Sequence, residues 1–381
     1  MAASSMPASS MPASSMAASS IAIRFADGGA EVQLPARPPT ESLLRGQPAE
    51  AATRLLPRLY ALCGRAHELA ARLAIDAARG GRCAATSAEL ADLRQEAIRE
   101  HARALFLDWP AQFGDNSPEN DAARDAALAT CPLFRGQSTP EDTRRWVDVH
   151  VAGSIDAADA LALETGDVSI AEAWRREGRT LPARLLDAIA PTAGQCADAG
   201  CPPLPLEPDT AWREDPWREL GAVRQAAASG PFEEAGNPSY ETGCWHRPAT
   251  HGPRQPRHAG DRLMARVKEI VALSRGAHHG LGARAWRLRR GEALAWVGMA
   301  RGILIHAIRL DADCARIASY RVRAPTDWNF APGGPVERTI RAQVRSSGAP
   351  HGPSTRAPWA MTARVCAAAY APCYPLEVGS A

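Results

Sequence analysis

The pattern of hydrophobic and polar positions divides the chain into a helical first part and a later part rich in short strands. Apolar residues recur at helical spacing over residues 50–78, where Pro57 marks a helix start or a kink and Cys63 is expected within the helix or close to its start. A second amphipathic segment begins at Ser87, a suitable N-cap, and runs to Phe106. Five further segments have the same periodicity: residues 143–164, 168–177, 181–189, 212–228 and 262–274. The sequence therefore predicts a mainly α-helical chain up to Ser274.

Beyond residue 290 the pattern changes to short apolar runs separated by turn residues. The predicted strands are residues 293–297, 303–308 and 316–322, and the last two form a hairpin around a turn at residues 311–313. Pro325 ends the hairpin because proline has no backbone N–H to donate to a ladder. We expect one α+β domain over residues 21–381, mainly helical, with a late β-hairpin region.

Composition and the N-terminal segment exclude several classes of protein. Residues 1–20 repeat Met-Pro-Ala-Ser-Ser units, lack the apolar core of a secretory signal, and are expected to be a disordered tail. No apolar run approaches the roughly 20 residues that span a bilayer, and a net charge of +2 gives little attraction to nucleic acid. Nine cysteines without an export signal indicate a reducing cytoplasm. The only lysine, Lys268, follows no glycine loop, which excludes a P-loop.

Four short motifs occur in a fixed order along the predicted domain. They are residues 62–67 (Leu-Cys-Gly-Arg-Ala-His), 240–243 (Tyr-Glu-Thr-Gly), 300–302 (Ala-Arg-Gly) followed by 325–329 (Pro-Thr-Asp-Trp-Asn), and 372–376 (Pro-Cys-Tyr-Pro-Leu). Together they resemble the R-x-C-G-x-C motif, the central E-V-G turn, the P-R-G hairpin with its P-T-T-W-N turn, and the D-P-C-x-x-C motif of nickel-iron hydrogenase large subunits. The resemblance covers nearly the whole domain and implies the helical core of that family.

The departures from the hydrogenase motifs are as informative as the matches. Ala66 and Leu376 stand where the family has its two bridging cysteines, and neither side chain can bind a metal. The family's histidine after the last motif is absent, and the chain ends eight residues after Cys373, which leaves no extension for a maturation protease. Residues 21–25 contain no acid for the family's proton relay. We therefore do not expect a hydrogen-cycling enzyme.

A large-subunit pattern with half of its metal ligands resembles the HupK/HoxV group of hydrogenase accessory proteins. That resemblance implies a scaffold that holds the iron half of the cofactor, the Fe(CN)2CO unit, through Cys63 and Cys373. It also implies that Arg301 and Thr326 donate hydrogen bonds to the two cyanides and that Pro325 shapes the pocket around the carbonyl ligand. The two cysteines lie 310 residues apart, so they can meet only in the folded domain. Losing the bridging thiolates should weaken iron retention and deny nickel a complete site.

The resemblance further implies partners in the cytoplasm. These would be small maturation chaperones of the HypC/HypD type, whose N-terminal cysteine could share the iron, and the precursor of the hydrogenase large subunit. Neither nucleic acid nor a membrane is an expected partner.

Several alternatives compete with the scaffold hypothesis. One is a metal-free chaperone that binds hydrogenase subunits or maturation proteins, and another is a hydrogenase with unusual ligands. A zinc site is less favoured because its candidates fit no tight Cys-x2-Cys template; they are Cys196, Cys201, Cys244 and the histidines at 246, 251 and 258. The basic segment 283–290 is better explained as an edge strand than as a nucleic-acid patch. His67 is not expected to be a ligand.

Overall fold

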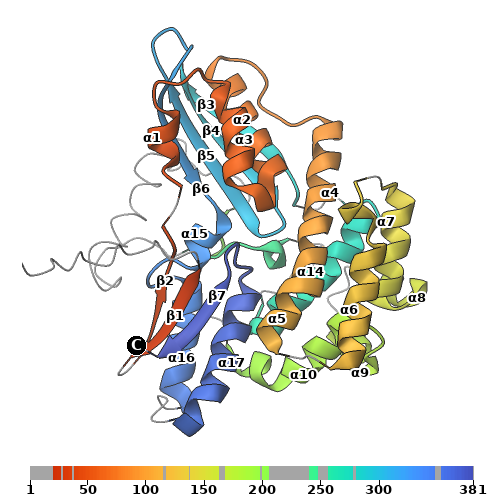
Figure 1. The fold of residues 1–381 in the computed structure, drawn as a ribbon. Coiled ribbons are helices and arrows are strands. Elements are labelled where there is room, and N and C mark those ends of the chain that lie inside the picture. Colours follow the sequence, from red (N-terminus) through yellow and green to blue (C-terminus); the bar gives the residue numbers. More distant parts are fainter. Residues whose placement is uncertain are drawn as a thin grey trace, which may run out of the picture.

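A computed structural model describes most of the chain (Figure 1). The described residues are 20–26, 29–36, 38–114, 117–136, 138–162, 168–197, 200–205, 240–247, 256–277, 280–347 and 353–380. Nearly all of the predicted N-terminal tail and the predicted helix 212–228 lie outside them. Within these ranges the fold is mainly helical with two small sheets, as the sequence predicts for the class.

The larger sheet is an antiparallel meander in the order β3-β4-β5-β6. Its strands are β3 Ala283–Arg289, β4 Glu292–Met299, β5 Gly302–Leu310 and β6 Ile317–Arg323. The three predicted strands correspond to β4, β5 and β6. Segment 283–290 is the predicted edge strand, because β3 alternates buried and exposed positions on the outer side of β4. Every residue of β4 is buried, so helices must cover the sheet.

Helices α2 (Ala51–Leu59) and α3 (Gly64–Ala78) provide that cover on one face of the sheet (Figure 1). The helical segment 50–78 is interrupted three residues after the predicted position, Pro57, because the chain leaves helical geometry at Tyr60 and makes a short 3-10 turn, Ala61–Cys63. Cys63 lies at the start of α3, as predicted. Helix α3 presents fully buried alanines to the sheet, which allows the two backbones to approach closely. The break points the start of α3 toward the centre of the molecule.

The other helices form a body beside the large sheet. Helix α4 (Ser87–Arg103) begins with a capping box in which Thr86, rather than the predicted Ser87, is the N-cap. It continues through a π turn, Ala104–Asp108, into α5 (Trp109–Phe113). The remaining helices here are α6 Pro118–Thr130, α7 Pro140–Val147, α8 Ile155–Ala162, α9 Val168–Glu177, α10 Leu181–Gln195 and α14 Ala259–Ser274. The predicted helix 143–164 is divided at Gly153, whose φ of 92° helices do not adopt.

A second, three-stranded sheet joins the two ends of the described chain. Strand β1 (Ile21–Ala26) pairs antiparallel with β2 (Gly29–Gln33) and parallel with β7 (Leu376–Ser380). Helices α16 (Pro335–Ser347) and α17 (Pro353–Ala369) pack beside it (Figure 1). The short helices α1 (Thr40–Leu44) and α15 (Pro325–Asn329) complete the fold. This sheet fixes the segment that follows Cys373.

Asn329, fully buried at the end of α15, holds together three segments that are distant in the sequence. Its side-chain amide donates to the carbonyl of Thr242 at 2.7 Å and accepts from the same residue's N–H at 3.0 Å. The hydroxyl of Thr242 in turn accepts from the N–H of Ile303 at 2.9 Å, at the start of β5. A Cβ on Gly302 would lie 2.5 Å from that hydroxyl and 2.9 Å from the N–H nitrogen of Gly243, so only glycine fits this crossing.

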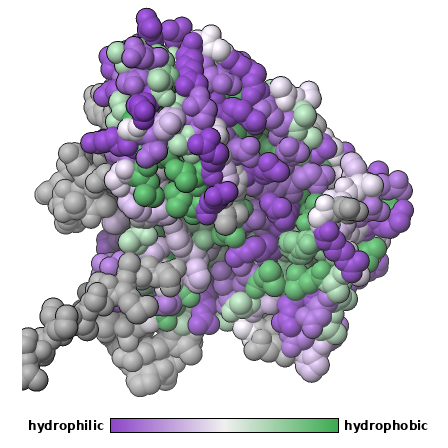
Figure 2. All heavy atoms as spheres, turned by 45° about the horizontal axis from the view of Figure 1, so that its top comes forward, coloured by the Kyte–Doolittle hydropathy of each residue, from purple (hydrophilic) through white to green (hydrophobic). Residues whose placement is uncertain are grey.

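Hydrophilic side chains cover most of the face drawn in Figure 2, and hydrophobic side chains gather there in separate areas. Among the described residues, no helix combines the length and the apolar character needed to cross a membrane.

We predict that Asn329→Ala lowers the free energy of unfolding by about 2 to 4 kcal/mol, because it leaves a buried N–H and a buried carbonyl of Thr242 without partners. Urea titration followed by circular dichroism measures the change. Gln47→Ala, at an exposed position, is the control and should leave the midpoint unchanged. Equal midpoints for both variants would contradict the role assigned to Asn329.

Candidate functional site

Cys63 lies where the 3-10 turn meets helix α3, and it is the N-cap residue of that helix. Its N–H donates to the carbonyl of Tyr60 at 3.1 Å, and the residue is 6% exposed. In the first turn of α3 the N–H groups of Arg65 and Ala66 donate to the carboxylate of Glu96 at 2.7 and 3.0 Å. Glu96 therefore performs the capping that the cysteine side chain does not, and the thiol remains available to the pocket.

Arg301 reaches Cys63 from the opposite part of the fold. It lies in the turn between β4 and β5, directly before Gly302, and is 3% exposed. Its Nη1 donates both to the Cys63 sulfur at 3.2 Å and to the Glu100 carboxylate at 2.9 Å. Its Nε is buried without a hydrogen-bond partner. The guanidinium thus has donor capacity that no described residue uses.

Thr326 and Cys373 form the other side of the same pocket. The Thr326 hydroxyl, buried in the first turn of α15, donates to the Cys373 sulfur at 3.0 Å. Pro325, at the first position of that helix, is also buried. Arg301 acts electrostatically on both sulfurs, and the sulfur charges act on each other. The structure therefore places Arg301 against Cys63 and Thr326 against Cys373, and Arg301 links the two pairs electrostatically. Pro325 directly precedes Thr326 in α15.

Both thiols are neutral near pH 7 in this environment. Burial raises the pKa of Cys63 far above its ordinary value, against the opposing effect of Arg301. Burial also raises the pKa of Cys373, and Arg301 and the Thr326 hydroxyl oppose that rise. As a residue Cys373 keeps partial exposure, whereas its sulfur is enclosed. The pocket can therefore stand empty without two buried negative charges.

Sequence reasoning missed the acids that surround Arg301. Glu100, buried on α4, is its carboxylate partner, and Arg103 pairs with Asp108 across the π turn at 3.1 Å. Burial raises the pKa of Glu96 and of Asp108. The available signal was the spacing of Glu96 and Glu100 by four residues, which places both carboxylates on one face of a predicted helix.

The two positions that lack a cysteine are occupied by packing side chains. Ala66 is fully buried against the large sheet, and Leu376 pairs with Ile21 in the parallel ladder of the small sheet. Neither position offers a ligand atom. Cys63 and Cys373 are consequently the only thiols that the two cysteine motifs supply.

His67 belongs to a separate buried network. Its Nδ1 lies 3.0 Å from Nε2 of His306, whose Nδ1 lies 2.8 Å from the Tyr320 hydroxyl, and its ring stacks on Tyr60 with centroids 4.1 Å apart. Burial lowers the pKa of His67 to about 3, so its ring is neutral.

Tyr60 also lines a surface hollow of about 1100 Å³, together with Asp327, the residue after Thr326.

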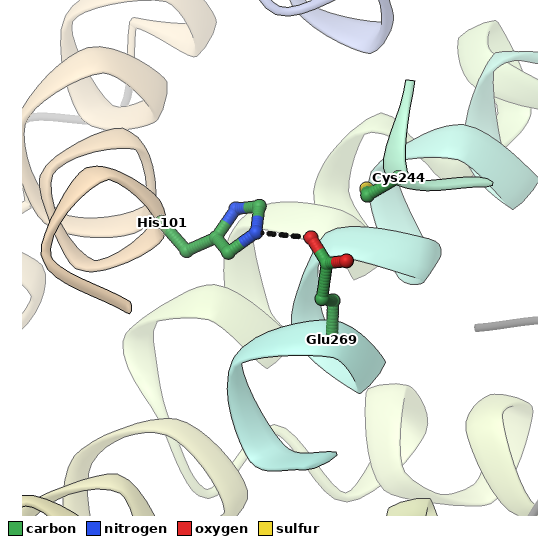
Figure 3. A group of neighbouring side chains, drawn as sticks. All are labelled: His101, Cys244 and Glu269. Carbon is green, nitrogen blue, oxygen red and sulfur yellow. Dashed lines mark hydrogen bonds and ion pairs between the residues drawn. The ribbon is translucent and has the colours of Figure 1, made fainter. Parts of the chain in front are cut away.

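A second buried cluster includes His101, the residue of α4 that directly follows Glu100. His101, Cys244 and Glu269 are buried, and one ligand atom from each lies within 4.8 Å of the others (Figure 3). His101 Nε2 is 2.5 Å from the Glu269 carboxylate, whose other oxygen pairs with Arg247. The alternative zinc set with Cys196, Cys201 and Cys244 is not assembled within the described ranges, and His251 lies outside them.

Comparison with known proteins places this site in context. No family model matches the chain. The hydrogenase expression/formation protein HoxV of Cupriavidus necator is 32% identical over 356 residues, which cover 89% of each chain. HupK of Bradyrhizobium diazoefficiens, with the same description, is 29% identical and covers 86% of this chain and 88% of its own.

Solved structures with the same fold are hydrogenase large chains. An NAD⁺-reducing [NiFe]-hydrogenase matches with a TM-score of 0.57 at 16% identity, over 92% of this chain and 94% of the other. A Ni-Fe-Se hydrogenase from D. vulgaris Hildenborough gives a TM-score of 0.51 at 12% identity. The chain belongs to the HoxV/HupK family of hydrogenase expression/formation proteins and has the fold of nickel-iron hydrogenase large subunits.

Proposed function

We propose that this protein acts in the cytoplasm as an accessory scaffold that holds the Fe(CN)2CO unit between Cys63 and Cys373 and passes it to the precursor of the hydrogenase large subunit. The observation that carries the proposal is the Arg301 guanidinium, which bonds the Cys63 thiol through Nη1 while its buried Nε has no partner. Buried donors usually have acceptors, so an unused charged donor on the arginine that bonds Cys63 suits an anionic acceptor such as a cyanide nitrogen.

The donor set fits the chemistry of the iron unit. Low-spin iron with cyanide and carbonyl ligands is a soft centre that accepts thiolates, and two thiols meet in this pocket. The cyanide nitrogens are strong acceptors, for which Arg301 supplies charged N–H groups. The Thr326 hydroxyl, which donates to the Cys373 sulfur, would stabilise that sulfur as a thiolate once iron is bound.

The arrangement also favours release over permanent retention. Ala66 and Leu376 remove two of the four thiolates that a binuclear centre would use, so nickel has no complete site and iron has only two anchors. Arg301 shares its charge with Glu100, which limits how tightly it holds an anionic cargo. A scaffold without the second metal has no hydrogen chemistry to perform, and we infer that the protein is not itself an enzyme.

Cargo would enter and leave on the side of Cys373. Cys63 is enclosed, whereas Cys373 keeps partial exposure. The hollow lined by Tyr60 and Asp327 lies close in sequence to both halves of the pocket and is large enough for a short segment of a partner. A maturation chaperone of the HypC/HypD type, with a cysteine at its N-terminus, could approach there and share the iron.

We predict that protein purified without oxygen from cells with the maturation machinery shows infrared bands of iron-bound carbonyl and cyanide, and that Cys63→Ala or Cys373→Ala removes them. Each substitution deletes one of only two thiolate anchors. Cys131→Ala is the matched control, because Cys131 is also buried with a raised pKa but caps α6 away from the pocket. The Cys131→Ala variant should keep the carbonyl and cyanide bands.

The same variants separate this function from that of a metal-free chaperone. If Cys63→Ala and Cys373→Ala fold normally and still support hydrogenase maturation in cells, the scaffold proposal fails and binding of partners through the surface explains the function.

We predict that the iron unit is held more weakly as the pH falls. The raised pKa values of Cys63 and Cys373 mean that both sulfurs take up protons when iron leaves, so release is favoured below those values. Affinity should fall by up to about tenfold per pH unit for each thiol that is protonated. Infrared intensity after dialysis between pH 8 and pH 6 measures the loss, and retention independent of pH would contradict thiolate ligation.

A further inference from the structure

Arg266, on helix α14, is a buried cation without a partner. The residue is 4% exposed, its Nε is sealed from solvent and has no hydrogen-bond acceptor, and it makes no ion pair with any described residue. Burial lowers its pKa, and the nearby charge of Arg301 lowers it further. Two like charges thus lie near each other in the interior, which folding alone does not favour.

The carboxylates around Arg266 are all engaged by other arginines. Glu269 pairs with Arg247 and with His101, and Asp108 pairs with Arg103 at 3.1 Å. Glu100 pairs with Arg301 at 2.9 Å. After these pairs are formed, Arg266 is left as the surplus positive charge of the cluster.

The thiol of Cys244 does not supply the missing negative charge. Among the neighbouring groups, Cys244 has the largest electrostatic influence on the pKa of Arg266. Burial raises the pKa of the Cys244 thiol far above its ordinary value, so the thiol is neutral near pH 7. The guanidinium therefore faces a neutral thiol on one side and Arg301 on the other.

A cation is a poor candidate for this region. His101, Cys244 and Glu269 could supply one ligand atom each (Figure 3), but the Glu269 carboxylate is already bonded at both oxygens. Arg247 and Arg266 would repel a metal ion, and Nδ1 of His101 lacks the partner that normally orients a ligating imidazole. The charge balance calls for an anion.

We infer that Arg266 is an anion-binding residue in the interior near Arg301 and that it takes one small monoanion. Two sources share this chemistry. One is a cyanide ligand of the carried iron unit, which would give the cargo a second guanidinium besides Arg301, and this form rests on the proposed function. The other is a free anion from solution that neutralises Arg266 while the pocket is empty.

The metal-free protein tests the site without reference to iron. Azide, a small linear monoanion, should raise the thermal unfolding midpoint of the wild type at constant ionic strength more than chloride does, and Arg266→Met should abolish this difference. Without added anion, Arg266→Met should unfold at the same temperature as the wild type or higher, because an unpaired buried charge is replaced by an apolar chain of similar length.

Arg247→Met is the matched control for the metal-free experiment. Arg247 is equally buried but bonds the Glu269 carboxylate and the carbonyl of Met299, so its loss should lower the midpoint. If Arg266→Met lowers the midpoint as much as Arg247→Met and azide has no effect on the wild type, Arg266 is structural and the inference is overturned.

The loaded protein distinguishes the two sources of the anion. A shift of one C≡N stretching band in Arg266→Met, with no shift in the exposed variant Arg145→Gln, identifies the anion as iron-bound cyanide. Unchanged bands together with the azide effect identify a free anion. If the wild type has no cyanide bands at all, the proposed function fails, and the azide measurement still decides whether Arg266 binds an anion.

Discussion

The site depends on one shared hydrogen-bond donor, Nη1 of Arg301, which bonds the sulfur of Cys63 and the carboxylate of Glu100. These three residues come from the turn of a hairpin, the start of α3 and the last turn of α4. Burying a guanidinium without an anionic partner is costly, and Glu100 supplies that partner to Arg301. Because the carboxylate takes part of the charge, Arg301 can remain in place with or without an anionic cargo.

Charge balance explains how the pocket can exist in two states. When it is empty, burial keeps Cys63 and Cys373 protonated, and Arg301 with Glu100 forms a neutral pair. If the pocket held iron as proposed, Cys63 and Cys373 would bind it as thiolates, and the metal and Arg301 would compensate their negative charges. Ala66 and Leu376 supply no further thiolate. Such a pocket would therefore hold a metal through two sulfurs alone.

The sequence predicted those parts of the site that depend on local motifs. Cys63, Arg301, Thr326 and Cys373 were found because the motifs around them resemble those of hydrogenase large subunits and occur in the same order, and each lies at a turn or helix start beside a glycine or proline. Glu100 and Arg266 could not be found in this way, because periodicity predicts which face of a helix is buried but not which polar residue is buried with a partner from another element.

Sequence periodicity also does not predict elements whose pairing partners are distant in the chain. The parallel pairing of β1 with β7 joins the two ends of the chain and has no local signal. The break of the predicted helix 143–164 at Gly153 does have a local signal, since an isolated glycine within a periodic segment weakens a helix. The helical periodicity continues through this glycine and hides the break.

Packing and charge have different roles in this molecule. The junction around Asn329 satisfies each of the backbone groups it touches, as expected of a region that must hold its shape. Elsewhere in the interior, Arg301 has a buried Nε without an acceptor, and Arg266 makes no ion pair with any described residue. Unsatisfied groups of this kind reduce stability. The proposed iron unit would supply Arg301 with the acceptor that its Nε lacks, and stability would then be gained on binding rather than on folding.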